Sequence, residues 1–201
     1  MKFVRTWIYY LIYPIVRLAF ALTHPVLHVS GRENLPKGPY ILCCNHSSWT
    51  DPFWVIFAVR PKMVFRFLAK RELETAPVIG FLMKQFGVIF VSRGHHDVPA
   101  LSKAQQALLQ GEQMMIFPEG TRVKPGAAAP AKPGAVQFSC ACKVPVVPMY
   151  LTQNRRLFRP LRVVIGKPYY PAAGEDPQDR LAMKAHAQEL LGRIYSMGEK
   201  Q

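Results

Sequence analysis

Residues 40–52 read Tyr-Ile-Leu-Cys-Cys-Asn-His-Ser-Ser-Trp-Thr-Asp-Pro, an apolar run followed by a polar segment and an Asp-Pro pair. The apolar run of residues 40–44 predicts a short buried strand. Asp51 followed by Pro52 predicts the cap and the first residue of a helix. His46 is therefore expected in the loop at the carboxyl end of the strand, and Asp51 is expected at the start of the helix.

The spacing between His46 and Asp51 is five positions. On one continuous helix, five steps of about 100° would leave the two side chains about 140° apart. The predicted strand, loop and helix supply the turn that can bring them together. An imidazole oriented by a carboxylate is a general base suited to a hydroxyl group. The alternative is that Asp51 only caps its helix and that His46 is a surface residue.

The alternation of strand and helix continues along the chain, which predicts an α/β fold with a central mixed sheet flanked by helices. Further strands are expected at residues 63–69, 87–92, 113–117, 144–151 and 162–165. Further helices are expected at residues 52–59, 77–86, 97–111 and 135–142 and from Asp176 to the tail. Residues 125–134 are rich in Pro, Gly and Ala and are expected to be irregular. With 201 residues and no internal repeat, the chain is expected to hold one such domain.

Loops at the carboxyl ends of parallel strands meet at one edge of a sheet, where ligands bind. The residues expected in such loops are His46, Lys70, Arg93, Glu119, Gly120, Thr121 and Arg122. Arg93 and Arg122 offer planar guanidinium groups that match phosphate oxygens, and Gly120 allows the backbone to approach a ligand closely. Glu119 is expected to hold Arg122 or to bond a substrate hydroxyl, unless it forms an ordinary surface ion pair. Lys70 suits an oxyanion or a phosphate equally.

The chain carries 26 Lys and Arg against 12 Asp and Glu, a formal charge of +14, although 50% of its residues are hydrophobic. This excess of positive charge predicts an anionic binding partner. Because no nucleic-acid-binding signature accompanies the charge, nucleic acid is not expected, and an anionic membrane surface is preferred.

The N-terminal residues 1–28 are expected to associate with that membrane. Their uninterrupted apolar stretch, residues 6–16, is shorter than the roughly 20 residues that span a bilayer core. Helical projection gives an apolar face and an opposite face that includes Arg5, Tyr13 and Arg17, the pattern of a helix that lies in the interface. The apolar face comprises Val4, Trp7, Ile8, Leu11, Ile15, Leu18 and Leu22. The alternatives are a helix packed on the domain's own core and, less favoured, a cleaved signal peptide.

The four cysteines lie in apolar surroundings without zinc-finger spacing, so they are interpreted as reduced core residues, and no metal or cofactor is expected. A zinc site built from Cys43, Cys44 and His46 is an alternative that lacks a fourth ligand. A second alternative is a covalent nucleophile, which would be Ser47, Ser48 or one of the cysteines Cys43 and Cys44, although no Gly-x-Ser-x-Gly elbow is present.

Four blocks of this sequence resemble, in order, the motifs of the glycerolipid acyltransferases, in particular the 1-acylglycerol-3-phosphate acyltransferase family. They are His46–Asp51 (His-x4-Asp), Gly87–Arg93, Phe117–Arg122 and Val144–Pro148. Ser92 departs from the pattern, in which an acidic residue frequently precedes the arginine. The resemblance implies a domain over residues 29–201 that is associated with the cytoplasmic face of the cell membrane.

The resemblance also implies a reaction. His46 would remove the proton from the free hydroxyl of 1-acylglycerol-3-phosphate as it attacks acyl-CoA or acyl-carrier protein, and Asp51 would orient the imidazole. The product would be phosphatidate, a precursor in phospholipid biosynthesis. Alternatives are another lysophospholipid or a lyso-aminolipid as acceptor, a lipid hydrolase, and a lipid-binding protein without activity.

A basic run follows the fourth block. Its members are Arg155, Arg156, Arg159, Arg162 and Lys167. Such a run most simply predicts a solvated face. The sharper hypothesis is that it contacts anionic lipid head groups or an acidic acyl carrier protein.

Overall fold

The computed structural model describes residues 2–59, 65–92, 97–172 and 174–199 of the chain. Its strands are β1 (Leu27–Ser30), β2 (Ile41–Cys44), β3 (Arg66–Lys70), β4 (Ile89–Val91), β5 (Met114–Ile116), β6 (Val146–Leu151) and β7 (Leu161–Ile165). Its helices are α1 (Lys2–Thr23), α2 (Asp51–Val59), α3 (Pro77–Gln85), α4 (Val98–Leu109), α5 (Gly134–Cys142) and α6 (Arg180–Glu199), with short 3-10 helices η1 (Arg32–Asn34) and η2 (Arg71–Thr75).

The strands form one seven-stranded sheet in the order β1-β7-β6-β2-β5-β3-β4. The five strands from β6 to β4 run parallel to one another, whereas β7 pairs antiparallel with β6 and β1 pairs parallel with β7. The predicted mixed sheet is therefore confirmed. Because β2, β5, β3, β4 and β6 point the same way, the loops that follow them share one edge of the sheet.

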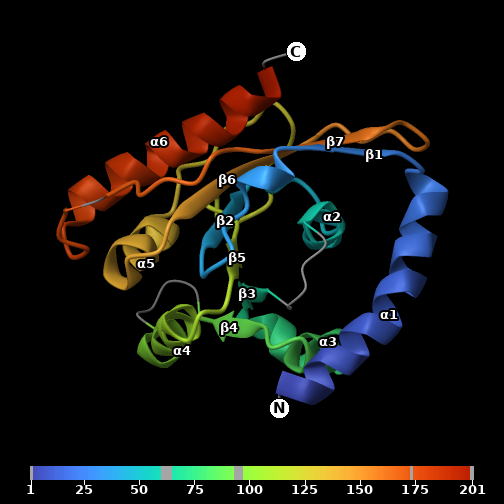
Figure 1. The fold of residues 1–201 in the computed structure, drawn as a ribbon, viewed down its shortest axis with the longest axis horizontal. Coiled ribbons are helices and arrows are strands. Elements are labelled where there is room, and N and C mark those ends of the chain that lie inside the picture. The colour runs from blue at the N-terminus through green and yellow to red at the C-terminus, as the bar shows by residue number, and fades with distance from the viewer. Residues whose placement is uncertain (1, 60–64, 93–96, 173, 200–201) are drawn as a thin grey trace.

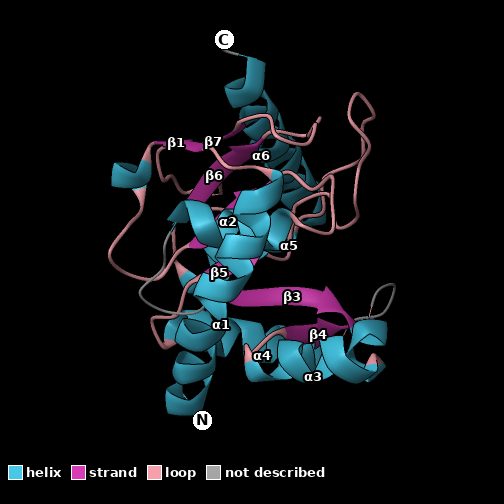
Figure 2. Cartoon of the chain, turned by 90° about the vertical axis from the view of Figure 1, so that its right-hand side faces the viewer, coloured by secondary structure: helices cyan, strands magenta, loops and turns pink. Residues whose placement is uncertain are grey.

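Helices cover both faces of this sheet (Figure 1). Alternate residues of each strand point to opposite faces, so Cys43 belongs to the core beneath α4, α5 and α6, and Cys44 belongs to the core beneath α2. Figure 2 shows α2 in front of strands β5 and β6. The two buried layers hold the sheet rigidly between the helices, which fixes where its loops emerge.

Helix α1 packs against α2 through aromatic side chains. The Phe20 ring lies 5.1 Å from the Trp54 ring, and Tyr13 lies 5.6 Å from Phe57. Arg17, expected on a solvated face, lies with its guanidinium carbon 5.2 Å from the centre of the Phe57 ring. The face expected to be polar is thus the one that meets the domain.

The other face of α1 is apolar and exposed. Leu11, Ile15, Leu18 and Leu22 are each between 65% and 71% exposed, and their spacing places them along one stripe of the helix. The helix is therefore packed on the domain, but not through its predicted apolar stripe. Among the described residues, no helix combines the length and the hydropathy needed to cross a bilayer.

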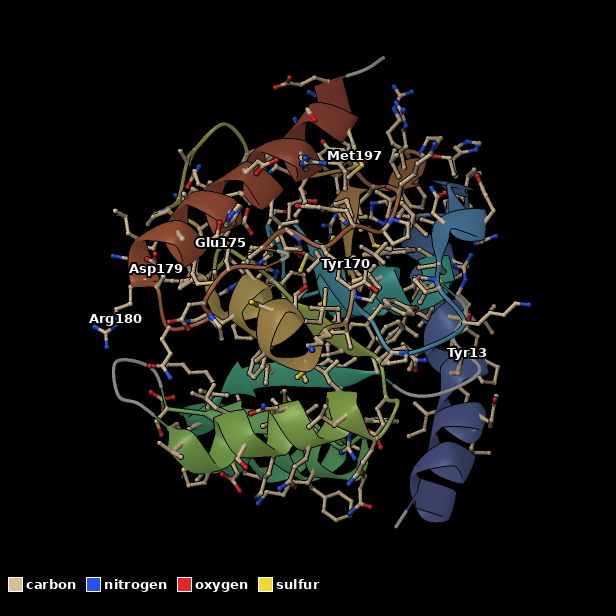
Figure 3. All side chains as sticks on the ribbon, turned by 60° about the vertical axis from the view of Figure 1, so that its left-hand side comes forward. Tyr13, Tyr170, Glu175, Asp179, Arg180 and Met197 are labelled. Atoms are coloured by element: carbon tan, nitrogen blue, oxygen red, sulfur yellow. The ribbon has the colours of Figure 1, made fainter. Side chains whose placement is uncertain are left out.

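Two predicted boundaries are wrong. The N-terminal segment, expected to extend to residue 28, ends its helix at Thr23, and Leu27 and His28 pair with β7 in the unpredicted strand β1. The last helix begins at Arg180 rather than near Asp176, because Asp179 Oδ1 accepts the backbone N–H groups of Leu181 (2.9 Å) and Ala182 (3.0 Å). Figure 3 shows Asp179 and Arg180 at this end of α6.

Candidate active site

His46 and Asp51 meet at the carboxyl end of β2, as their spacing predicts. His46 Nδ1 lies 2.7 Å from Asp51 Oδ2. Because an ionised carboxylate can only accept hydrogen bonds, Nδ1 is the donor in this contact, so the lone pair of the neutral imidazole lies on Nε2. The His46 side chain is 17% exposed, whereas Asp51 is fully buried. The imidazole is thus oriented from behind, and a ligand can approach its other nitrogen.

The turn between the two residues closes around the carboxylate. Asp51 Oδ2 also accepts the backbone N–H groups of Ser47 at 2.7 Å and Ser48 at 2.8 Å. Asp51 is the first residue of α2, so its carboxylate caps the preceding loop rather than the helix, which corrects the predicted helix cap. The spacing of five residues is therefore what lets one carboxylate hold both the loop and the ring.

The carboxylate of Asp51 is also paired with Arg155, a member of the basic run for which the sequence predicts a solvated face. That prediction is wrong for Arg155, whose side chain is 8% exposed and whose Nη2 contacts Asp51 Oδ1. Burial raises the pKa of Asp51, but the bond from His46 and the charge of Arg155 outweigh it, and the pKa lies below its ordinary value. Asp51 is consequently an anion at neutral pH.

The loop after β5 supports His46 from the opposite side. The Phe117 ring stacks on the imidazole with a centroid separation of 3.9 Å and an interplanar angle of 15°. The backbone N–H of Val123 donates to the His46 carbonyl at 2.8 Å. The loop that carries His46 and the loop that carries Glu119 and Arg122 are therefore joined.

Glu119 is turned inward in that same loop. It is 1% exposed, its Oε2 accepts the backbone N–H of His46 at 2.6 Å, and its Oε1 accepts the hydroxyl of Tyr195 from α6. Burial raises the pKa of Glu119 to about 7 even though the bonds from Tyr195 and His46 lower it. The interpretation of Glu119 as a surface ion pair is therefore wrong, because its carboxyl group holds the backbone of the His46 loop.

Arg122 lies at the exposed side of the site. Its guanidinium carbon sits 3.9 Å from the centre of the Trp49 ring, and Trp49 is 63% exposed. This cation–π contact fixes the plane of the guanidinium, which leaves its edges to bind an anion. Thr121 is exposed beside it. Gly120 has a φ of 65°, the left-handed region that glycine adopts without strain, and a Cβ atom there would lie 3.0 Å from Lys132 Cγ.

The other two predicted basic residues have different outcomes. Lys70 ends β3 on the same edge of the sheet, where its Nζ pairs with Glu72 at 2.8 Å and its side chain is 45% exposed. Arg93 lies outside the described residues. The structure thus brings His46, Asp51, Glu119 and Arg122 into one constellation and leaves Lys70 at its edge.

Asn45 also belongs to the site, although it is not among the predicted site residues. Its fully buried side chain donates to the Leu151 carbonyl at 2.9 Å and accepts the Leu151 N–H at 2.8 Å. These bonds extend the pairing of β2 with β6 by one residue and fix the point at which the chain turns to His46. A polar residue that ends an apolar run was the available signal.

The alternative chemistries have little support. Cys43 and Cys44 are fully buried, and burial raises the pKa of both thiols, so neither forms a thiolate readily. The Ser47 hydroxyl contacts Arg155 at 3.3 Å, and that of Ser48 contacts Thr50 at 3.0 Å. Within the described ranges, no three His, Cys, Asp or Glu side chains are grouped as metal ligands.

Comparison with protein families gives a match over residues 26–152 to the family model described as Acyltransferase. The curated "1-acyl-sn-glycerol-3-phosphate acyltransferase BAT2, chloroplastic" of Brassica napus is 30% identical over 156 residues, which are 71% of this chain and 44% of that protein. The 1-acyl-sn-glycerol-3-phosphate acyltransferase of Bacillus subtilis is 29% identical over 178 residues, 86% of this chain and 88% of that protein. The human alpha form is 32% identical over 181 residues, 84% of this chain and 63% of that protein.

A solved structure shares the fold. The crystal structure of the 1-acyl-sn-glycerophosphate acyltransferase PlsC from Thermotoga maritima superposes with a TM-score of 0.73 at 24% identity, covering 98% of this chain and 82% of that one. The chain spans about 44% of the length of the plastid relatives from Brassica napus and Arabidopsis thaliana. The family match covers every predicted site residue but ends before Arg155 and Tyr195.

Proposed function

The chain belongs to the acyltransferase family, and on that premise we propose that it transfers an acyl group from an acyl thioester to the free hydroxyl of 1-acylglycerol-3-phosphate, giving phosphatidate. The observation that carries this proposal is the hydrogen bond of 2.7 Å between His46 and the buried Asp51. It leaves Nε2 of His46 free to accept a proton at the edge of the sheet where Arg122 can bind an anionic head group.

The reaction needs one base and no covalent enzyme intermediate. Nε2 of His46 takes the proton as the acceptor oxygen attacks the thioester carbonyl, and Asp51 stabilises the imidazolium. The tetrahedral adduct then expels the thiolate, which takes up that proton and leaves as a free thiol. Base catalysis of this kind contributes about 10²–10⁴-fold, so the positioning of both substrates must supply much of the rest. No metal or cofactor enters this scheme, and the donor is acyl-CoA or acyl-carrier protein.

The acceptor's phosphate is the proposed ligand of Arg122, with Gly120 and Thr121 beside it and Lys70 and Arg93 on neighbouring loops. Two charge-assisted bonds to a guanidinium are worth roughly 1.5–3 kcal/mol each where water is excluded. Arg122→Ala is expected to raise the KM for the acceptor about 10- to 100-fold while kcat falls less. A loss of kcat at unchanged acceptor KM would contradict this role.

The proposed partner of the exposed apolar surface is an anionic membrane at the cytoplasmic face of the cell membrane. The outer stripe of α1 is continued by the loop between β6 and β7, where Leu157 is 64% and Phe158 70% exposed. The backbone N–H of Phe158 donates to the Thr23 carbonyl at 2.7 Å, so this loop lies against the end of α1 (Figure 1). The exposed residue Arg159 lies beside the loop tip and matches anionic head groups.

Vesicle flotation tests this partner. Half-burial of the exposed side chains, at about 1.5–3 kcal/mol for each full burial, would give several kcal/mol of affinity. Ile15→Glu with Leu18→Glu changes only the outer stripe and is expected to release the protein from anionic vesicles. Leu181→Glu, at the exposed start of α6, is the control and is expected to stay bound. Unchanged binding of the double variant would exclude α1 as the membrane element.

A panel of acceptors tests the reaction. Purified protein is incubated with a radiolabelled acyl thioester and, separately, with 1-acylglycerol-3-phosphate, other lysophospholipids, a lyso-aminolipid or no acceptor. Labelled phosphatidate from the first acceptor, with little release of free fatty acid, is the expected result. Preference for another acceptor would replace the substrate, and free fatty acid formed at the same rate without acceptor would replace the transferase with a hydrolase.

A further inference from the structure

Arg155 follows β6 and directs its guanidinium into the turn that carries His46 and Asp51. Besides Asp51 Oδ1, it donates from Nη1 to Thr50 Oγ1 at 2.9 Å and from Nη2 to Ser47 Oγ at 3.3 Å. Its Nε donates to the carbonyl of Thr152 at 2.8 Å, which fixes the base of the side chain. All three nitrogens are held, so the orientation of the guanidinium is determined by the fold.

This arrangement divides the carboxylate of Asp51 between two tasks. Oδ2 receives His46 Nδ1 and the two serine N–H groups, whereas Oδ1 receives Arg155. Rotation of the carboxylate would break contacts on both oxygens at once. The position of Arg155 depends in turn on β6, which pairs in parallel with β2. Two strands therefore set the direction in which Oδ2 points.

We propose that Arg155 is a positioning residue for the acyl transfer. It holds the carboxylate of Asp51 against His46, and its fixed positive charge opposes protonation of this pair. The inference rests on the function proposed above. A proton added to the pair of His46 and Asp51 is repelled by the guanidinium of Arg155, which lies in the same buried turn. The pair is thereby kept in the state in which Nε2 can accept a proton from the substrate.

Other ionisable groups of the described residues lie near the pair or near Arg155. They are Cys44 at the end of β2, Glu119 and Arg122 after β5, Tyr150 on β6, Tyr195 on α6 and His24 after α1. Burial, and then the charge of Arg155, lower the pKa of His24. Glu119 bonds the backbone of His46 rather than its ring, and Cys44 is buried with a raised pKa. Arg155 is thus the described cation that directly contacts the Asp51 carboxylate.

The adjacent Arg156 offers a matched control. It is exposed, and its backbone carbonyl accepts hydrogen bonds from Arg159 and His24. Arg155→Gln and Arg156→Gln therefore remove the same charge at neighbouring positions, but only the first removes the contact with Asp51. Arg155→Lys retains a charge while losing the planar group that reaches Asp51, Thr50 and Ser47 together.

The test measures kcat and acceptor KM against pH with a labelled acyl thioester and 1-acylglycerol-3-phosphate. Arg155→Gln is expected to lower kcat at least 10-fold, to leave acceptor KM within about twofold, and to move the acid limb of the profile to higher pH. Arg155→Lys is expected to recover part of kcat and to return the limb toward its wild-type position. Arg156→Gln is expected to match the wild type in kcat and limb.

Three results would overturn the proposal. They are a wild-type kcat in Arg155→Gln, a lower kcat with the acid limb unmoved in a folded variant, and a raised acceptor KM with kcat unchanged, which would make Arg155 a substrate ligand. Circular dichroism establishes folding. If the Gln variant does not fold, Arg155→Lys carries the test through kcat, and a wild-type kcat in Arg155→Lys would then overturn the proposal. An NMR titration of ring-labelled histidine needs no substrate. If wild-type protein transfers no acyl group, the proposed function fails, and an unmoved His46 titration in Arg155→Gln would separately overturn this inference.

Discussion

Replacement of Asp51 by Asn removes one charge and almost no volume from a turn in which both oxygens of the carboxylate accept hydrogen bonds. Oδ2 accepts three hydrogen bonds and Oδ1 accepts Arg155, whereas an amide has one oxygen and one NH2 group. If the amide oxygen faces His46 and the serine N–H groups, the NH2 group opposes the Arg155 guanidinium. If the amide flips, NH2 faces His46 and favours the tautomer whose Nε2 cannot accept a proton.

Both orientations have a cost, which falls on kcat and on the stability of the fold. Loss of the correct tautomer lowers kcat by about 10⁴-fold in a comparable carboxylate–imidazole pair of a serine protease, so a loss of about 10³–10⁴-fold is expected here. A buried guanidinium left without its anion destabilises the fold by about 3–5 kcal/mol.

Steady-state transfer of a labelled acyl group measures the first effect, and urea unfolding measures the second. Asp179→Asn is the matched control, since it makes the same exchange at the cap of α6, where Asn serves as well as Asp. It is expected to keep both kcat and stability. An Asp51→Asn protein that is folded and retains kcat within tenfold of wild type would refute the assigned role of the carboxylate.

Three further predictions concern the support of the His46 loop. Glu119 has a pKa of about 7 in the folded state, above its ordinary value of 4.5, so it lowers the stability of the fold as pH rises from about 4.5 through 7. Glu119→Gln should therefore flatten the dependence of the free energy of unfolding on pH in that range, as measured by urea titrations. An unchanged slope would contradict the burial of this carboxyl group. Asn45→Ala leaves the N–H and carbonyl of Leu151 unpaired and should lower the free energy of unfolding by roughly 2–4 kcal/mol. A decrease of less than about 0.5 kcal/mol would show that these two bonds do not stabilise the fold. Gly120→Ala places a side chain at a φ of 65° and should lower the free energy of unfolding by about 1–2 kcal/mol and weaken acceptor binding. Wild-type values for both quantities would show that the loop conformation is not required.

The sequence predicts those parts of the site that local structure determines. An apolar run, a polar loop and an Asp-Pro pair place His46 and Asp51 on a strand–turn–helix unit, and the strand–helix alternation places Arg122 at the same edge of the sheet. These inferences need only neighbouring residues and the rule that parallel strands share an edge. They are confirmed by the contact between His46 and Asp51 and by the bond from Val123 to the His46 carbonyl.

The parts that the sequence does not predict depend on pairing between distant segments. Arg155 lies 104 positions beyond Asp51 and Tyr195 lies 76 beyond Glu119. Their roles follow from the adjacency of β6 and β2 and from the packing of α6 on β6, which hydropathy does not encode. Arg155 is further obscured because it stands in a run of exposed arginines.

The N-terminal helix illustrates the same limit. Its periodicity predicts two faces but not which of them meets the domain. Phe20 and Tyr13 pack on α2 because aromatic side chains fill the space beside Trp54 and Phe57, and the aliphatic stripe is left outside.

The rate of phosphatidate formation by His46→Gln in a single turnover, with enzyme in excess over a labelled acyl thioester and saturating 1-acylglycerol-3-phosphate, tests the role of the imidazole most directly. Gln keeps a polar side chain of similar size but cannot take up a proton at neutral pH. Removal of the base should slow the transfer by about 10²–10⁴-fold while the folded variant still binds acceptor. Transfer by His46→Gln within tenfold of the wild-type rate would contradict the role of His46 as the general base.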